Sequence, residues 1–296
     1  MTTAPFGPLG VAMVTPFDES GVVDEAALAD LVAHLLDTGH ETLVVNGTTG
    51  ESATTADEEK TRLVRTVVGL AGHRAKVVAG VGSADTRHTV HLAEQAAAAG
   101  AAGLLVVTPY YSRPSQAGLV AHFEAVADAT DLPVMLYDIP ARTATAISTQ
   151  TLVALASHPR IVAVKDAKGD FAATQEVMAS CDLAFYSGSD EHNLPLLAMG
   201  AAGIVSVVSH VAGREYSKMI AAVADGDLVR ARSIAERLVP AHRAVMTRRQ
   251  GAVAAKAALQ LLGVLSGRDV RLPQTPMTDE EVAELSTELR SAGLLS

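Results

Sequence analysis

The sequence predicts an α/β fold, a (β/α)8 TIM barrel followed by a C-terminal helical appendix. Two observations support this prediction: short apolar runs ending in turn residues recur eight times, and amphipathic segments lie between them. The chain has 296 residues, of which 49% are hydrophobic, so it can form one large core. A split into two separate folding domains is therefore disfavoured.

The apolar runs are apolar almost throughout, which is typical of strands buried on both faces of a parallel sheet. We expect these strands near Val11, Val44, Val78, Val106, Leu136, within residues 161–169, and near Phe185 and Val205. Between them, residues 24–37, 56–70 and 86–99 place apolar side chains at i, i+3 and i+4, as amphipathic helices do. Eight such alternating units close naturally into a barrel.

An open, doubly wound sheet is the alternative architecture. It commonly carries a GxGxxG pattern after its first strand, but here the first strand runs into VAMVTPFDES, which has no glycine at that place. Beyond the eighth expected strand, residues 222–248, 252–262 and 279–291 have helical patterns. We therefore assign residues 1–224 to the barrel and residues 225–296 to C-terminal helices packed on it as one structural unit.

Composition limits the partners of this chain. Lys and Arg number 23 against 33 Asp and Glu, and the net charge of -10 opposes binding to nucleic acid or to an anionic membrane surface. Residues 192–213 contain no Asp, Glu, Lys or Arg. They are interrupted by Pro195, Gly200, Gly203, Ser206 and Ser209, which favours a helix and a strand over a membrane span. One cysteine and no HxH or HExxH spacing predict neither a disulfide framework nor a metal site. With no visible secretory signal, we expect a cytoplasmic protein.

Lys165 is the strongest candidate for chemistry. It ends an apolar strand and shares its face with Ala163, so it should point into the barrel mouth, where barrel enzymes place their active sites. Burial there should lower the pKa of its ammonium and supply a neutral amine that attacks a carbonyl to form a Schiff base. The alternative is a structural lysine paired with Asp166 or Asp190. We expect Lys168, in the loop beyond, to be a solvated charge.

Other polar residues stand at expected strand ends. The Tyr137 phenol could move protons, although alone it could equally be a barrel aromatic that bonds a carbonyl. The turn GTTGES, residues 47–52, offers backbone N–H groups and the hydroxyls of Thr48 and Thr49, suited to a carboxylate but equally to a phosphate, or to no ligand. Arg142 offers a planar fork for a second carboxylate, or is simply a surface arginine.

Four motifs together resemble a known family. GTTGES, VTPYYSRPSQAGL, LPVMLYDIPARTA and IVAVKDAKGD match in order and spacing the pyruvate-dependent class I lyases of the N-acetylneuraminate lyase superfamily, over nearly the whole chain. Within that family, the TPYY pair and the arginine after YDIPA resemble the dihydrodipicolinate synthase branch more than the sialic acid lyases. This implies a lyase that needs no metal and no cofactor beyond an imine on the protein.

The resemblance also implies roles for the catalytic residues. Lys165 would form the imine with pyruvate, and Tyr137 would be the acid/base of a proton relay. Thr49 would link that phenol to Tyr111, whose ring would reach into a neighbouring subunit's site. The resemblance therefore implies self-association as a homodimer or homotetramer.

The substrate-binding residues are implied in the same way. Thr48 and Thr49 would hold the carboxylate of pyruvate and Arg142 that of L-aspartate 4-semialdehyde, while Gly188 and Val205 would line the pocket. The implied product is 4-hydroxy-tetrahydrodipicolinate, used in diaminopimelate and lysine synthesis.

Two departures from the family pattern bear on specificity and regulation. Ser189 stands where the family often has the first Asp of Gly-Asp-Asp, which keeps open a sugar-acid lyase using a different aldehyde. A non-catalytic paralogue that binds a keto acid is a further alternative, disfavoured because the four implied catalytic residues are all present. The lysine-inhibited members carry an Asn and a Glu after the third strand and histidines on the second helix. Here Ala84 and His88, and Asp57 and Lys60, occupy those places, so we expect weak or absent lysine inhibition.

Overall fold

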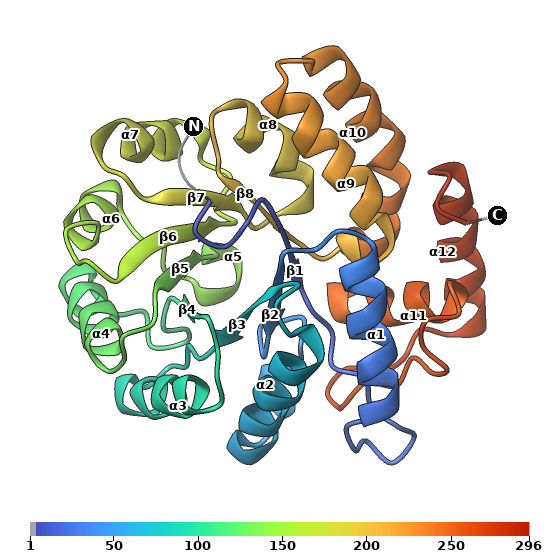
Figure 1. Ribbon diagram of the computed structural model, residues 1–296, viewed down its shortest axis with the longest axis horizontal. Coiled ribbons are helices and arrows are strands. Elements are labelled where there is room, and N and C mark those ends of the chain that lie inside the picture. Colours follow the sequence, from blue (N-terminus) through green and yellow to red (C-terminus); the bar gives the residue numbers. More distant parts are fainter. Residues whose placement is uncertain (1–3, 296) are drawn as a thin grey trace.

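A computed structural model describes residues 4–295 and confirms the predicted barrel. Its strands pair in chain order, all parallel, and β8 closes the ring against β1 (Figure 1). The strands are β1 (Leu9–Ala12), β2 (Thr42–Val45), β3 (Lys76–Gly80), β4 (Gly103–Val107), β5 (Val134–Asp138), β6 (Ile161–Asp166), β7 (Ala184–Ser187) and β8 (Gly203–Ser206). All eight lie in the apolar runs from which they were predicted.

Helices surround the barrel and cover the outward faces of its strands (Figure 1). They are α1 (Glu25–Asp37), α2 (Asp57–Ala71), α3 (Thr86–Ala98), α4 (Gln116–Asp128), α5 (Pro140–Thr143), α6 (Thr149–Leu155), α7 (Phe171–Ser180), α8 (Asn193–Ala198) and α9 (Ser209–Ala224), with short 3-10 turns η1 (Ser52–Thr54) and η2 (Asp190–His192). Side chains cap the N-termini of several of these helices. At the start of α1, for example, the Asp24 carboxylate accepts from the Ala27 N–H at 3.0 Å.

Burial explains why the strands lack the alternation of a half-exposed sheet. Most strand residues are fully buried, because their inward side chains fill the barrel and their outward ones pack on helices. The apolar stretch at residues 192–213 forms α8, β8 and the start of α9, as expected. Within residues 4–295, the structure contains no helix both long and apolar enough to cross a membrane.

The chain continues into α10 (Leu228–His242), a π-helical turn η3 (Arg243–Thr247), α11 (Gly251–Leu261) and α12 (Asp279–Ser291). The single helix expected over 222–248 is interrupted. Gly226 takes φ +76°, a left-handed conformation that favours glycine, and the Asp227 side chain caps α10 by accepting from the Arg230 N–H at 2.9 Å.

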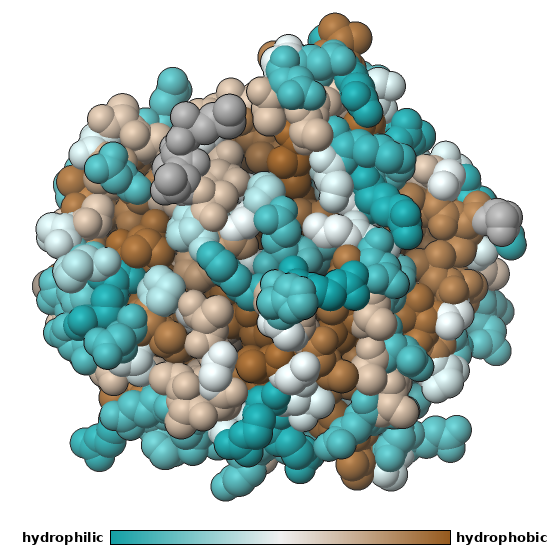
Figure 2. Space-filling view, viewed as in Figure 1, coloured by the Kyte–Doolittle hydropathy of each residue, from teal (hydrophilic) through white to brown (hydrophobic). Residues whose placement is uncertain are grey.

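The C-terminal helices pack against the barrel side of the molecule. α10 and α11 both contact α9, and α12 contacts α10 and α11. On the face in Figure 2, hydrophilic side chains lie around much of the rim, while hydrophobic ones gather beside α12. The division of the chain at residues 224 and 225 stays a prediction.

Candidate active site

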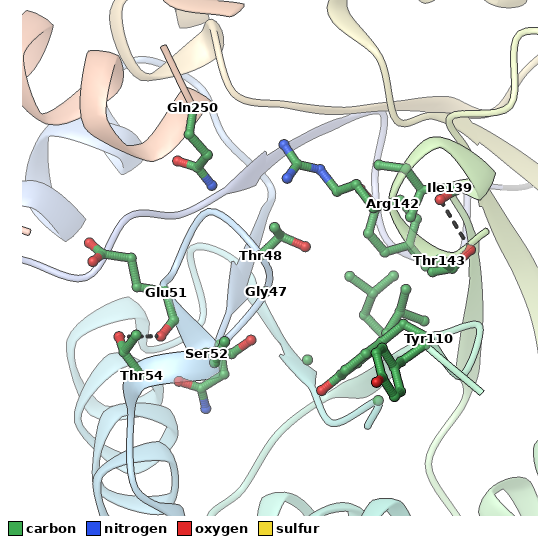
Figure 3. A pocket seen from close by; sticks show the side chains of 18 of the residues that line it. Gly47, Thr48, Glu51, Ser52, Thr54, Tyr110, Ile139, Arg142, Thr143 and Gln250 are labelled. Carbon is green, nitrogen blue, oxygen red and sulfur yellow. Dashed lines mark hydrogen bonds between the residues drawn. The ribbon is translucent and has the colours of Figure 1, made fainter. Parts of the chain in front are cut away.

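A cavity of about 620 Å³ opens at the carboxyl ends of the strands. Its walls come from the loops after β2, β4 and β5 and from the chain around α11 (Figure 3). Four sequence-predicted residues line it, namely Thr48, Tyr111, Tyr137 and Arg142. Barrel enzymes build their active sites at this end, so the cavity is the candidate active site.

Lys165 is not among the residues that line the cavity, but it contacts Tyr137, which is one of them. Lys165 ends β6, is 4% exposed, and its Nζ is 4.3 Å from the centroid of the Tyr137 ring. The strand register pairs the same two residues across β5 and β6. Burial lowers the pKa of the Lys165 ammonium to about 8, against a partial opposing effect of the Asp190 carboxylate. At pH 7 about a tenth of the Lys165 side chains are therefore neutral, far more than for an ordinary lysine.

Neither carboxylate considered as a partner for Lys165 forms an ion pair with it. Asp166 accepts from the Thr174 hydroxyl and, at 2.8 Å, from the Lys168 N–H. Asp190 accepts from the Ser206 hydroxyl, the Tyr216 hydroxyl (3.1 Å), the Asn193 amide (3.2 Å) and the N–H groups of Val207 (3.0 Å) and Val208 (3.2 Å). The alternative of a structural, ion-paired Lys165 is therefore not supported within residues 4–295.

Tyr137 is 6% exposed, and its ring lies against the Lys165 ammonium. Burial raises the pKa of its phenol to about 12, partly offset by the positive charge of Arg142. The phenol therefore keeps its proton at neutral pH and can donate it to a developing negative charge. Arg142 is the nearby cation that would stabilise a transient phenolate.

The turn at residues 47–52 has the shape of an anion cradle. It is closed by bonds from the N–H groups of Gly50 to the Gly47 carbonyl (3.0 Å) and of Glu51 to the Thr48 carbonyl (3.2 Å). The N–H groups of Thr48 and Thr49 take no part in these bonds. Thr48 is exposed to the cavity, whereas Thr49 is 6% exposed. Within a single copy of residues 4–295, the Thr49 hydroxyl makes no hydrogen bond to Tyr137 or Tyr111.

Arg142 and Tyr111 stand at the cavity mouth. Figure 3 shows the Arg142 side chain extending from the short helix α5, which follows β5, toward Thr48. Tyr111 takes φ +72°, in the left-handed region that a tyrosine rarely adopts, and is 94% exposed. A large ring held in a strained conformation and left in solvent by its own chain is typical of a residue that contacts something else.

Gly188 directly follows β7 and Val205 lies in β8, and Gly188 is not among the residues that line the cavity. A Cβ at Gly188 would lie 2.8 Å from Lys165 Cγ and 2.9 Å from its Cε, so only glycine lets the lysine side chain lie there. Val205 is buried in β8 and is not among the residues that line the cavity.

Lys168 was expected to be a solvated charge, and that expectation is wrong. Its side chain is 12% exposed, and Nζ lies 3.6 Å from Asp138 Oδ2. Asp138 ends β5, so this partner comes from a different strand and could not be read from the loop alone. Burial raises the pKa of Asp138 to about 6, and the Lys168 charge opposes that rise.

Comparison with known proteins shows the family to which this chain is related. The family model described as the dihydrodipicolinate synthetase family matches residues 5–292. The chain belongs to this family. A 4-hydroxy-tetrahydrodipicolinate synthase of Kineococcus radiotolerans is 62% identical over 290 residues, which are 98% of this chain and 94% of that protein. This confirms the resemblance seen in the four motifs.

Solved structures of the dihydrodipicolinate synthetase family have the same fold. A dihydrodipicolinate synthase of Bacillus anthracis is 43% identical with a TM-score of 0.93, over 97% of this chain and 98% of that one. The enzyme of Cyanidioschyzon merolae, solved with lysine bound, is 40% identical with a TM-score of 0.95, over 99% and 100%.

Sequence analysis missed a part of this family member's cavity. Gln250, Arg271, Pro273 and Gln274 line it, although they belong to the C-terminal region. Figure 3 shows Gln250 reaching toward the cavity from above the turn. The predicted site residues stand at strand ends, whereas these four follow no strand. In residues 4–295, no three His, Cys, Asp or Glu side chains are grouped so as to hold a metal ion.

Proposed function

We propose that this protein is a lyase that condenses pyruvate with L-aspartate 4-semialdehyde through an imine on Lys165, giving 4-hydroxy-tetrahydrodipicolinate. The observation that carries the proposal is the buried Lys165 amine 4.3 Å from the ring of Tyr137, which lines the cavity together with Thr48 and Arg142. The family membership and the names of the relatives support the same reaction.

The reaction follows from the chemistry of a neutral amine. Lys165 Nζ attacks the carbonyl carbon of pyruvate, water leaves, and the imine loses a methyl proton to become an enamine. The enamine carbon then attacks the aldehyde carbon, whose oxygen takes a proton. Finally the substrate's own amino group displaces Lys165 from the imine carbon, which closes the ring and frees the enzyme. The protein needs no oxidant or reductant for these steps.

Tyr137 supplies and removes the protons in this scheme. Its phenol is protonated at rest, as its raised pKa requires, and it can pass a proton to the carbinol oxygen that leaves as water. Thr49 and the Tyr111 ring of a neighbouring copy would connect that phenol to solvent. Hydroxyl groups suit such a relay because each both donates and accepts.

The carboxylates of the two substrates would bind at separate places. Among residues 4–295 the N–H groups and hydroxyls of Thr48 and Thr49 donate to no protein group, and they suit the carboxylate of pyruvate. The guanidinium of Arg142, extended toward Thr48, suits the carboxylate of the aldehyde. Gly188 and Val205 would complete the wall around the imine.

Imine trapping tests the proposal. Incubation with pyruvate and borohydride should add a reduced adduct to the peptide that contains Lys165, detected by mass spectrometry. No adduct, or an adduct on Lys168, would contradict the mechanism. The same trapping excludes the non-catalytic paralogue when turnover accompanies it.

We expect the rate of imine formation to rise with pH. Only the neutral amine attacks, so kcat/KM for pyruvate should increase about tenfold per pH unit below the Lys165 pKa of about 8 and level off above it. Initial rates between about pH 6 and pH 9 measure this profile. A flat profile below pH 8 would show that another group limits the reaction.

A different aldehyde, as in the sugar-acid lyases, is the second candidate and is motivated by Ser189. The Asp190 carboxylate could in principle bind sugar hydroxyls, but both of its oxygens are already bonded within the protein. This favours the short aldehyde. Rates with L-aspartate 4-semialdehyde and with sugar aldehydes, measured side by side, decide between them.

We predict weak or no inhibition by lysine. The residues at the family's regulatory positions bond one another: His88 Nε2 lies 2.8 Å from Asp57 Oδ2, and Lys60 Nζ lies 3.4 Å from Asp57 Oδ1. Lys60 Nζ also donates to the Thr55 carbonyl at 2.6 Å, so this ammonium is already bonded within the protein. A lysine titration of the rate that reached half-inhibition below a millimolar concentration would contradict this prediction.

We also propose a homodimer or homotetramer acting in the cytoplasm. The exposed, strained Tyr111 supports a second copy that covers it. One solved relative, 33% identical with a TM-score of 0.94, is described as a monomeric variant, so assembly needs its own measurement. Light scattering coupled to size exclusion should give at least a dimer; a monomer with full activity would remove the role of Tyr111.

A further inference from the structure

A second buried lysine lies beside the cradle, on a C-terminal helix. Lys256 of α11 has a side chain that is 1% exposed, and its Nζ is 2.5 Å from Oε1 of Glu51, whose side chain is 4% exposed. Lys256 Nζ also donates to the Asp269 carbonyl at 2.7 Å and lies 4.2 Å from the Phe17 ring centroid. This fully enclosed ion pair joins the C-terminal helices to the turn at residues 47–52.

Glu51 is the residue of that turn which most needs support. It takes φ +55°, a left-handed conformation unfavourable for a residue with a side chain. Its second carboxylate oxygen accepts from the backbone N–H of Arg271 at 2.9 Å, and its backbone carbonyl accepts from the Thr54 hydroxyl at 3.0 Å. Figure 3 shows the Glu51 carboxylate pointing away from Thr48, so its bonds anchor the turn on the side opposite Thr48.

Arg271 forms further bonds between the C-terminal segment and the chain that follows the turn. Its guanidinium donates to both carboxylate oxygens of Glu59, at 2.6 Å and 2.8 Å, and to the Thr54 carbonyl at 2.8 Å. Glu59 is in the first turn of α2, directly after the cradle. The C-terminal segment therefore fixes the cradle at Glu51 and again where the chain leaves it.

A buried ion pair is a poor source of stability, since two charges lose their hydration, and apolar side chains of equal volume often serve as well. What the pair supplies is a fixed geometry. We propose that Lys256 and Glu51 are positioning residues that hold the Thr48 and Thr49 N–H groups in place for the carboxylate of pyruvate. This inference rests on the proposed function.

Kinetics of Lys256→Met test the proposal. The variant leaves the Glu51 carboxylate buried and unpaired, so the turn should shift and pyruvate KM should rise about tenfold or more, since small misplacements of a binding group can cost up to about 10²-fold. The pair touches neither Lys165 nor Tyr137, so kcat at saturating pyruvate should change much less. A pyruvate KM within about twofold of the wild type would overturn the proposal.

A double variant separates positioning from simple stabilisation. Glu51→Gln combined with Lys256→Met removes the unpaired charge, so Tm should recover toward the wild type while pyruvate KM stays raised. Recovery of both would show that the pair acts only on stability. If Lys256→Met does not fold, Lys256→Arg keeps the charge with a different reach and should give a smaller rise in KM, and no rise would overturn the proposal.

A matched control corrects for general destabilisation. Leu289 of α12 is fully buried in the C-terminal helices, and Leu289→Ala should lower Tm without changing pyruvate KM. An equal rise in KM there would overturn the specific role of the pair. Borohydride trapping distinguishes the two proposals: failure to trap pyruvate on wild-type Lys165 defeats the proposed function, whereas normal trapping with unchanged variant KM defeats only the positioning role.

Discussion

Lys165→Met is expected to abolish turnover and pyruvate trapping while making the fold more stable. Methionine has a similar length and no amine, so no imine forms, and loss of a covalent nucleophile costs on the order of 10⁴-fold or more in rate. The rise in stability has a separate cause. Burial lowers the Lys165 pKa from 10.5 to about 8, which at neutral pH corresponds to roughly 3 kcal/mol of destabilisation by the buried charge.

The sign of this effect can be followed with pH. The folded pKa lies below the unfolded value, so the cost of burying the ammonium is fully present below pH 8 and disappears as the pH rises toward 10.5. Thermal melts should therefore show Lys165→Met several degrees more stable than wild type at neutral pH, with the difference shrinking in alkali. Loss of activity together with a lower Tm would indicate misfolding instead.

Lys168→Met is the matched control for Lys165→Met. It removes a nearby ammonium in an ion pair with Asp138 and leaves Lys165 in place. Pyruvate should still be trapped on Lys165. The buried Asp138 carboxyl then lacks its cation, so this variant should lose stability at neutral pH, opposite to the change at Lys165.

Periodicity explains what the sequence could predict. Strict alternation along a strand placed Lys165 on the inward face, and the structure confirms that it is buried against Tyr137. The eight strands were predictable for a similar reason, since strands covered on both faces must be apolar. The interrupted helix near Gly226 was missed because helical periodicity continues across a short turn, and the left-handed glycine was the available signal.

The features that the sequence did not predict depend on contacts between distant parts of the chain. Lys168 was misjudged because its partner Asp138 comes from another strand. Gln250 and Arg271 reach the cavity only through the packing of the C-terminal helices, which no local pattern specifies. Lys256 did leave a signal: it is the single charged residue in the otherwise uncharged helix α11. The reasoning that singled out Lys165 in an apolar strand applies equally to a lysine in an apolar helix.

Tyr137→Phe is expected to lower kcat by about 10²-fold or more, the usual effect of losing a general acid/base. The imine should still form slowly on Lys165. The variant keeps the ring, so the contact with the Lys165 ammonium and the local dielectric environment persist. Only the hydroxyl group, with its transferable proton, is lost. Steady-state kinetics should therefore show a fall in kcat, and borohydride trapping after long incubation should still label Lys165.

Tyr186 offers a closely matched control. It pairs with Lys165 across β6 and β7, as Tyr137 does across β5 and β6, and burial likewise raises its pKa to about 12. Its hydroxyl, however, accepts from the Phe6 N–H at 3.0 Å and is committed to the fold. Tyr186→Phe should therefore cost about 1–3 kcal/mol of stability by leaving that N–H unpaired, with little change in kcat. Equal losses of kcat in both variants would mean that burial of a phenol beside the lysine matters, and that Tyr137 carries no proton.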